Sequence, residues 1–196
     1  MDLWLPLALF AFVSSITPGP NNVMLSASGI AFGFRRTLPH LFGVWAGFAL
    51  LLAVCGAGVG TVIERFPSFE SVLRTVGSAY LLYLAWKLRA AFDMRSTRAS
   101  SRPLRFYEAV AFQFVNPKAW VMAVTAMAVF GSGREPRWLA IGAVCFVFLL
   151  VGLPCITGWA MLGASLRPWL DSERRRRQLG IAVAVLMVYS VIAIWW

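Results

Sequence analysis

The sequence predicts an all-α polytopic membrane protein with six transmembrane helices, arranged as two inverted three-helix repeats whose helices 1 and 4 are broken at proline motifs. Three observations lead to this fold class. The chain of 196 residues is 60% hydrophobic and only 13% charged, and its apolar runs exceed the roughly 18 residues that indicate a membrane span. Two proline motifs interrupt apolar stretches, with Pro18 and Pro117 separated by 99 positions, about half the chain. Basic residues gather in alternate loops.

Six apolar stretches provide the expected spans. A hydrocarbon layer about 30 Å thick needs about 20 helical residues, so six spans and short loops leave no room for a separate soluble domain. The spans are expected at Leu3 to Ala31, Leu38 to Thr61, Val72 to Leu88, Phe106 to Phe130, Trp138 to Leu162 and Leu179 to Trp196. The first is kept as a span rather than a signal peptide, because Met1-Asp2 offers no basic region and no A-x-A-like cleavage site follows.

The distribution of basic residues sets the expected orientation. The loops after the first, third and fifth spans carry 13 of the 18 Lys and Arg residues. The opposite loops hold only Arg65, Arg74, Arg134 and Arg137. By the positive-inside rule the basic loops face the cytoplasm, which places both termini outside. The net charge of +10 is therefore interpreted as a topology signal that also attracts anionic lipids, and not as a nucleic-acid-binding surface.

The polar stretch from Asp93 to Arg105 is expected to be a cytoplasmic linker between two halves of one transmembrane domain, 1–92 and 106–196. Each half contains three spans. Because an odd number of spans reverses the side from which the second half enters the membrane, any structural repeat is inverted. The second span carries a Gly43-x-x-x-Gly47 pair, which allows close helix packing either within the chain or between copies in a homo-oligomer.

The first break, Thr17-Pro18-Gly19-Pro20-Asn21-Asn22, is a candidate substrate-binding or gating segment. Proline removes helix hydrogen bonds, so a new half-helix is expected to begin near Asn21. In lipid, freed backbone groups persist only where they are buried in protein or line a polar cavity. A helix N-terminus offers N–H donors and partial positive charge suited to a carboxylate. Thr17, Asn21 and Asn22 add uncharged donors and acceptors.

The second break, Asn116-Pro117-Lys118, carries the one charged residue that lies deep within an expected span. Burying an ammonium group costs several kcal/mol and is tolerated mainly toward a polar cavity or a partner. Lys118 is therefore a candidate to contact a substrate carboxylate or a gating carbonyl, the alternative being a side chain that snorkels to the interface. Gln113, one turn before Asn116, is expected to face the same cavity. A matched pair of interrupted spans indicates a transport site.

Other chemistries find little support in the sequence. No Cys/His cluster or Walker-type glycine loop is present, so no enzyme activity, metal or cofactor is expected. His40 is the only histidine and is expected to be interfacial rather than a proton relay. Glu108 lies only at the start of the fourth span, so no acidic residue deep within a span is available to carry a proton. A membrane thiol-disulfide electron carrier would need cysteine pairs on the broken helices. A non-transporting structural membrane protein remains the other alternative.

Several motifs together resemble the LysE/RhtB family, the lysine exporter and homoserine/threonine efflux proteins. These motifs are Thr17-Pro18-Gly19-Pro20-Asn21, Gly33-Phe34-Arg35, Gly43-x-x-x-Gly47 and Asn116-Pro117-Lys118-Ala119. The stretches from Pro18 to Asn22, from Gln113 to Asn116 and from Arg177 to Tyr189 look most like the cysteine/O-acetylserine exporter branch. The resemblance covers essentially the whole chain. It implies secondary active export of small amino acids from the cytoplasm across a bacterial inner membrane, with protons as the coupling ion.

Overall fold

The structure is a computed structural model that describes residues 3–59, 71–72, 74–79, 81–83, 85–86, 102–131, 136–170 and 172–195. In these residues the regular secondary structure is helical, with no strand. The elements are α1 (Trp4–Ile16), α2 (Pro20–Phe32), α3 (Phe34–Val54), η1 (Cys55–Val59), α6 (Phe106–Gln113), α7 (Pro117–Ala126), η2 (Met127–Gly131), α8 (Arg137–Leu166), η3 (Arg167–Leu170) and α9 (Glu173–Trp195). The described residues between 71 and 86 are also helical.

Length and composition give two membrane-spanning segments among the described residues, Phe34–Gly58 and Arg137–Trp169. A third is added if the bent pair Phe106–Gln113 and Pro117–Gly131 is counted as one span. The fold class of an all-helical membrane protein is thus confirmed at this level. The count of six spans and their inverted arrangement stay predictions. Part of the expected third span and most of the expected linker, from Asp93 to Ser101, lie outside the described residues.

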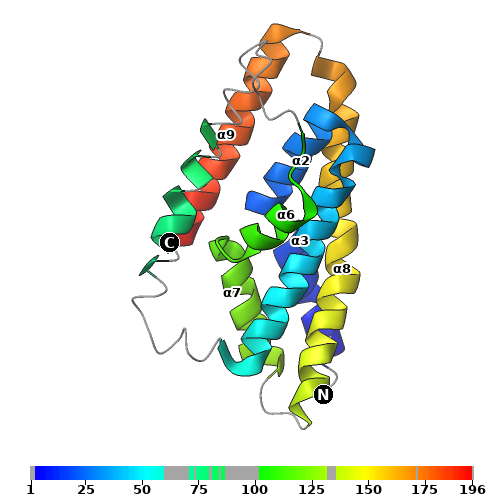
Figure 1. Cartoon of the computed structure of the whole chain (residues 1–196), viewed down its shortest axis with the longest axis vertical. Coiled ribbons are helices and arrows are strands. Elements are labelled where there is room, and N and C mark those ends of the chain that lie inside the picture. The colour runs from blue at the N-terminus through cyan, green and yellow to red at the C-terminus, as the bar shows by residue number, and fades with distance from the viewer. Residues whose placement is uncertain are drawn as a thin grey trace.

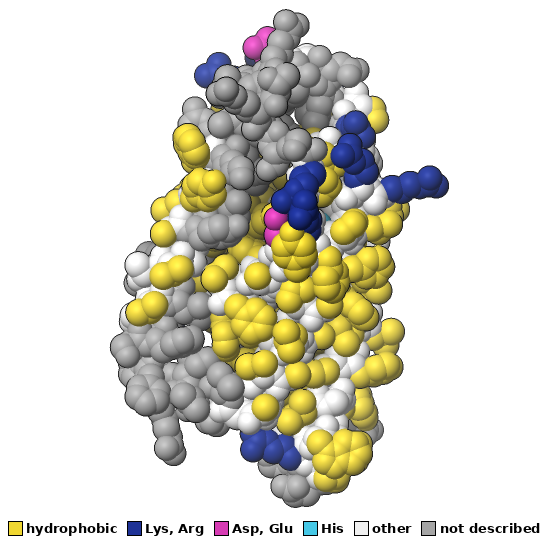
Figure 2. Space-filling model, viewed as in Figure 1, with side chains coloured by type: hydrophobic (Ala, Val, Ile, Leu, Met, Phe, Trp, Pro, Cys, Tyr) yellow, Lys and Arg dark blue, Asp and Glu magenta, His cyan; other side chains and the backbone are white. Residues whose placement is uncertain are grey.

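The helices form an elongated bundle in which α3 and α8 run side by side and α9 lies on the opposite flank (Figure 1). Figure 2 shows a face covered largely by hydrophobic side chains, with Lys and Arg near its two ends. Many large apolar side chains are exposed on this bundle, among them Val121, Phe146 and Leu150, each at about 60%. Such a surface is unfavourable in water but suits contact with lipid acyl chains.

An apolar core joins α1, α3, α7 and α8 around the fully buried Phe148. The ring of Phe10 packs against those of Phe130 and Phe148, with both pairs of centroids 5.9 Å apart. The Phe48 ring completes this cluster at 5.5 Å from Phe148. Tilted and edge-on aromatic pairs of this kind hold their helices in a defined rotation. This core fixes the wall against which the two proline breaks are placed.

Glycine residues allow the closest helix contacts. A Cβ on Gly43 would lie 2.3 Å from the carbonyl oxygen of Phe106, and one on Gly47 would lie 2.8 Å from Gln113 Cγ. The Gly43-x-x-x-Gly47 face is thus filled by α6 of the same chain, which confirms the within-chain interpretation of this pair. A Cβ on Gly29 of α2 would similarly lie 2.3 Å from the carbonyl oxygen of Ala160 on α8.

Two helices begin before the spans expected from the sequence. α3 begins at Phe34, after Gly33 with φ of 81°, and not at Leu38. His40 lies in the second turn of α3, on the same face as Gly43, and is only 2% exposed. α9 begins at Glu173 and not at Leu179, because Ser172 Oγ accepts the N–H of Arg175 at 3.2 Å and arginine is a good helix former.

α6 begins where a surface ion pair and a helix cap coincide. The Glu108 carboxylate accepts the backbone N–H of Arg105 at 2.7 Å, which satisfies a donor that the helix leaves free at its start. The same carboxylate accepts two N–H groups of Arg102, each at 2.7 Å. This bidentate contact raises the pKa of the Arg102 guanidinium. Because α6 is anchored here, its other end delivers Gln113 to the second break.

Candidate functional site

The first break separates α1 from α2 by three residues. α1 ends at Ile16, Thr17 is extended with φ of −62° and ψ of 140°, and Gly19 is fully extended. Pro20 is the first residue of α2, one position before the predicted start, and this position suits proline because its missing N–H has no helical partner there. The first hydrogen bond of α2 runs from Val23 N–H to Gly19 oxygen at 3.0 Å. The backbone N–H groups of Asn21 and Asn22 come before Val23 in the chain and therefore have no hydrogen-bond partner within α2.

The second break has the same construction. α6 ends at Gln113 and α7 begins at Pro117, and the two helices are bent by 65°. Asn116 occupies the N-cap position with φ of −92° and ψ of 104°, yet its side chain makes no capping hydrogen bond. The ring of Pro117 packs on Gly77, where a Cβ would lie 2.4 Å from the ring. Both predicted breaks therefore exist as interruptions, each followed by a half-helix that begins with proline.

A pair of amides joins the two breaks. Asn21 Nδ2 donates to Gln113 Oε1 at 2.8 Å, and Gln113 Nε2 donates back to Asn21 Oδ1 at 3.1 Å. Gln113 is fully buried and also donates to the carbonyl oxygen of Ala109 at 3.0 Å. Buried amides that satisfy each other in this way resist separation, because either one alone would be left with unpaired donors and acceptors. The pair holds α2 and α6 in register across the molecule.

Lys118 forms a second link between the breaks. Its ammonium donates to the carbonyl oxygen of Thr17 and to Thr17 Oγ1, both at 2.9 Å, and to the carbonyl oxygen of Pro18 at 3.3 Å. Carbonyls at the end of a helix lack helical partners and carry partial negative charge, so a cation is favourable there. Of the contacts considered for Lys118 from the sequence, the structure shows the one with backbone carbonyls. Gly19 leaves room for the lysine stem, since a Cβ there would lie 2.7 Å from Lys118 Cδ.

Asn22 secures the same end of α1 from the other side. Its Nδ2 donates to the carbonyl oxygen of Ser15 at 2.8 Å and to that of Thr17 at 2.9 Å. The side chain is 4% exposed. Its amide N–H groups therefore serve to satisfy the carbonyls that the break releases from α1, which is a positioning role within the site.

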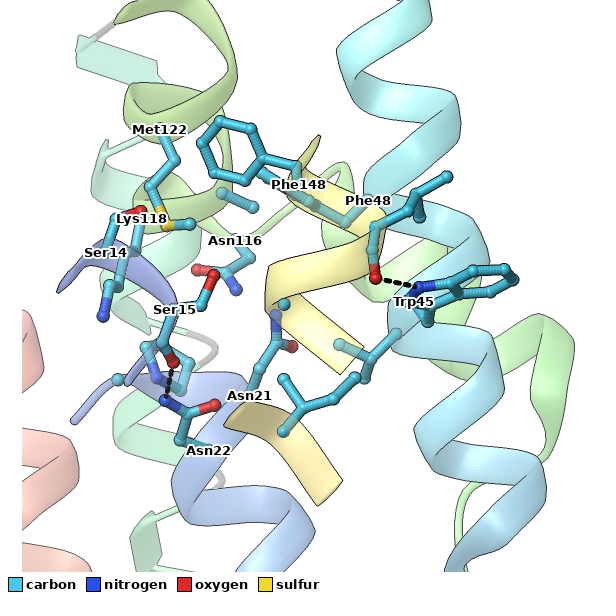
Figure 3. A pocket seen from close by; sticks show the side chains of 17 residues that line it. Ser14, Ser15, Asn21, Asn22, Trp45, Phe48, Asn116, Lys118, Met122 and Phe148 are labelled. Carbon is cyan, nitrogen blue, oxygen red and sulfur yellow. Dashed lines mark hydrogen bonds between the residues drawn. The ribbon is translucent and has the colours of Figure 1, made fainter. Parts of the chain in front are cut away.

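Between the two breaks lies a cavity of about 60 Å³. A water molecule needs about 10 to 15 Å³ on this measure, so the cavity has room for a small solute. It is lined by Ser14, Ser15, Gly19, Pro20, Asn21, Asn22, Val44, Trp45, Phe48, Asn116, Lys118, Ala119, Met122, Phe148, Leu149, Gly152 and Ile156. Figure 3 shows the side chains of Asn21 and Asn116 converging from opposite sides, with Phe48, Met122 and Phe148 forming an apolar wall.

Six of the ten residues predicted for the site line this cavity: Gly19, Pro20, Asn21, Asn22, Asn116 and Lys118. The other four hold the lining in place. Thr17 and Pro18 accept the hydrogen bonds of Lys118, Gln113 pairs with Asn21, and Pro117 begins α7. The wall contributed by α3 and α8 was not predicted from the sequence. One residue of that wall is itself held rigidly, because Trp45 Nε1 donates to the carbonyl oxygen of Leu149 at 3.0 Å.

The described residues offer no group of three or more His, Cys, Asp or Glu side chains that could hold a metal ion. Cys55, Cys145 and Cys155 are free thiols that lie in η1 and α8 and not on the broken helices themselves. Amide and hydroxyl side chains, the first residues of α2 and the side chain of Lys118 thus line the cavity opposite an apolar wall. These groups can bind and orient a small polar solute.

Two broken helices that meet around a small cavity are typical of membrane transporters. The chain belongs to the LysE-type translocator family, whose model matches residues 12–193. The predicted family membership is thereby confirmed, and the protein is a translocator rather than an enzyme.

Relatives of nearly the same length share about a third of the residues. The chain is 32% identical to a cysteine/O-acetylserine efflux protein of Klebsiella pneumoniae, over 94% of this chain and 93% of that protein. It is 31% identical to the cysteine/O-acetylserine efflux protein of Salmonella choleraesuis, over 97% and 99% of the two chains. The protein of that name from Escherichia coli is 29% identical over 95% and 94%. No solved structure matches this chain.

Proposed function

We propose that the protein is a secondary active exporter of small amino acids or their derivatives, and that the carboxylate of its substrate binds between the broken helices α1/α2 and α6/α7. The observation that carries this proposal is the cavity itself, which contains both the N-terminus of α2 and Lys118. Helix-end N–H groups and an ammonium are the two features that suit an anionic group. The names of the relatives, all cysteine/O-acetylserine efflux proteins, support an amino acid as the substrate.

The contacts of Lys118 suggest how binding opens the site. Its three ammonium protons face the three oxygen atoms of Thr17 and Pro18. A carboxylate is a stronger acceptor than a carbonyl, because charge-assisted hydrogen bonds are roughly twice as strong as neutral ones. A bound substrate would draw Lys118 away from the end of α1 and loosen the link between the two breaks. Substrate binding and movement of the gate would then be one event.

The size and lining of the cavity favour a short, neutral side chain. Its small volume of about 60 Å³ favours a short side chain over an aromatic one. Phe48, Met122 and Phe148 offer apolar contact but no charge to pair with a basic or acidic side chain. We propose that proton-motive force drives export, as the resemblance to proton-coupled family members implies.

The test is counterflow of amino acids in reconstituted vesicles, screened across the twenty amino acids and O-acetyl-L-serine with and without a pH gradient. Wild-type protein should exchange a small neutral amino acid faster with the gradient, and a flat response to every compound would refute the exporter. The Lys118→Met variant keeps the stem and removes the charge, and should lose most exchange. Arg35→Met, which also removes one charge but lies outside the cavity, is the matched control. Equal exchange by both variants would refute the role of Lys118.

We further propose that six spans form two inverted halves, 1–92 and 106–196, in the bacterial inner membrane with both termini outside. Trp138 and Trp169 near the two ends of α8 are each 69% exposed, which makes them a matched pair of reporters. In intact cells a membrane-impermeant thiol reagent should label Trp138→Cys, and should label Trp169→Cys only after permeabilisation. The reverse pattern would refute this orientation.

A further inference from the structure

Asn116 carries a hydrogen-bond acceptor that the protein leaves unused. The side chain is 1% exposed, and its Oδ1 atom has no hydrogen-bond partner. Among the buried polar side chains of the described residues, only the two ring nitrogens of His40 share this condition. An unpaired buried polar group costs about 1 to 3 kcal/mol, so its persistence calls for an explanation.

The position of Asn116 makes the unused acceptor more notable. An asparagine at an N-cap normally hydrogen-bonds the free N–H groups of its own helix. Asn116 occupies that position at the start of α7 and makes no such bond. The side chain instead lines the cavity, where Figure 3 shows it pointing inward. The Asn116 side chain thus belongs to the cavity lining and makes no hydrogen bond to the free N–H groups at the start of α7.

The groups around Asn116 indicate what it accepts from. A carboxylate has no proton to donate to Oδ1, so the partner is the other end of the substrate. No Asp or Glu is among the cavity-lining residues that the structure describes, so a positively charged group finds only neutral oxygens there. The anion-binding features, the N-terminus of α2 and Lys118, belong to the same small cavity. In an α-amino acid the ammonium and carboxylate groups are bonded to the same carbon atom, so one substrate can contact the acceptor and the anion-binding features together.

We propose, building on the function proposed above, that Asn116 Oδ1 accepts a hydrogen bond from the α-ammonium group of the substrate. The carboxylate then lies toward the α2 N-terminus and Lys118, and the side chain points at the wall of Phe48, Met122 and Phe148. Asn116 is thus the residue that requires the substrate to be an amino acid and not merely a small carboxylic acid. The acceptor is a neutral amide and not a carboxylate. It therefore orients the ammonium group without binding it so tightly that release is prevented.

Three probes separate the two ends of the substrate: L-cysteine, 3-mercaptopropionate, which lacks the ammonium, and cysteamine, which lacks the carboxylate. Competition by each probe against radiolabelled O-acetyl-L-serine counterflow gives its apparent affinity. A hydrogen bond that involves a charged group corresponds to a factor of roughly 10 to 100 in affinity. Wild-type protein should therefore prefer L-cysteine over 3-mercaptopropionate by about that factor.

Two substitutions at position 116 then test the acceptor. Asn116→Leu should lower L-cysteine affinity by about tenfold or more and change 3-mercaptopropionate affinity little, which collapses the preference. Asn116→Asp keeps an acceptor and a good N-cap residue, so L-cysteine affinity should be kept or raised while 3-mercaptopropionate is rejected more strongly. A purely structural role would move both probes together.

Two results would overturn the inference while leaving the exporter intact. One is an unchanged preference in Asn116→Leu. The other is loss of L-cysteine binding in Asn116→Asp with retention in Asn116→Leu, which would mean that the amide faces the carboxylate through its N–H groups. A wild-type protein that exchanges neither O-acetyl-L-serine nor any of the twenty amino acids would instead refute the proposed function as a whole.

Discussion

The contact between α2 and α8 should be intolerant of a single methyl group. A Cβ on Gly163 would lie 2.1 Å from the carbonyl oxygen of Ser26 and 2.7 Å from its carbonyl carbon. Both atoms belong to the backbone, so no side chain can turn away. Ordinary contact begins at 3.4 Å, and α2 must therefore move by about 1.3 Å in Gly163→Ala. Overpacking of this kind costs about 1 to 3 kcal/mol.

The matched control lies on the same helix. A Cβ on Gly158 meets nothing within 4 Å. Gly158→Ala should therefore be neutral or stabilising by up to about 1 kcal/mol, because alanine is the better helix former. For a chain of this size, 1 kcal/mol corresponds to about 2 to 4 °C in Tm. Gly163→Ala should then unfold roughly 2 to 12 °C below wild type.

The assay is thermal unfolding of purified protein in detergent, followed by counterflow in vesicles. Because α2 carries Asn21 into the cavity, its displacement should also reduce exchange by Gly163→Ala at temperatures where the protein is folded. Equal Tm values for Gly163→Ala and Gly158→Ala would refute the reasoning. So would a destabilised Gly163→Ala whose exchange is unaffected, since that result would separate the helix contact from the site.

Three further substitutions probe the links between the breaks. Gly19→Ala places a Cβ 2.7 Å from Lys118 Cδ and 2.9 Å from Nζ, so the flexible lysine head should move off the end of α1. We expect counterflow to fall as in Lys118→Met, with no additional loss in the double variant. An additive loss would contradict this expectation. Asn21→Gln and Gln113→Asn should each destabilise the protein, whereas the double variant should restore the amide pair. Thermal unfolding in a double-mutant cycle should give a coupling energy of about 0.6 to 1.7 kcal/mol. Zero coupling would contradict the pairing.

The breaks could be located from sequence because proline acts locally. Its ring fixes φ and removes an N–H whatever the rest of the chain does, so the starts of α2 at Pro20 and of α7 at Pro117 follow from the residues themselves. Asn116 and Lys118 enter the site for the same reason. Residues next to a helix-breaking motif therefore lie at the break itself, so their place in the site can be predicted from the motif.

The wall of the cavity could not be located in this way. Trp45 and Phe148 lie in helices that are apolar on most faces, so composition does not reveal which face turns inward. Helix rotation is decided by contacts such as that of Gly29 with Ala160, 131 positions away, and glycine alone does not name its partner. The burial of His40 could not be predicted for a related reason, since it depends on packing and not on the residue type.

The cavity takes its lining from residues 14–48 on one side and 116–156 on the other, so neither half of the chain holds a complete site. Chimaeras that join the first half of this protein to the second half of a relative would therefore create new combinations of lining and not mere mixtures of two intact sites. The Asn21 and Gln113 amides would act as the compatibility test for each pairing. Substrate preference in this family could then diversify by exchange of halves as well as by point substitution.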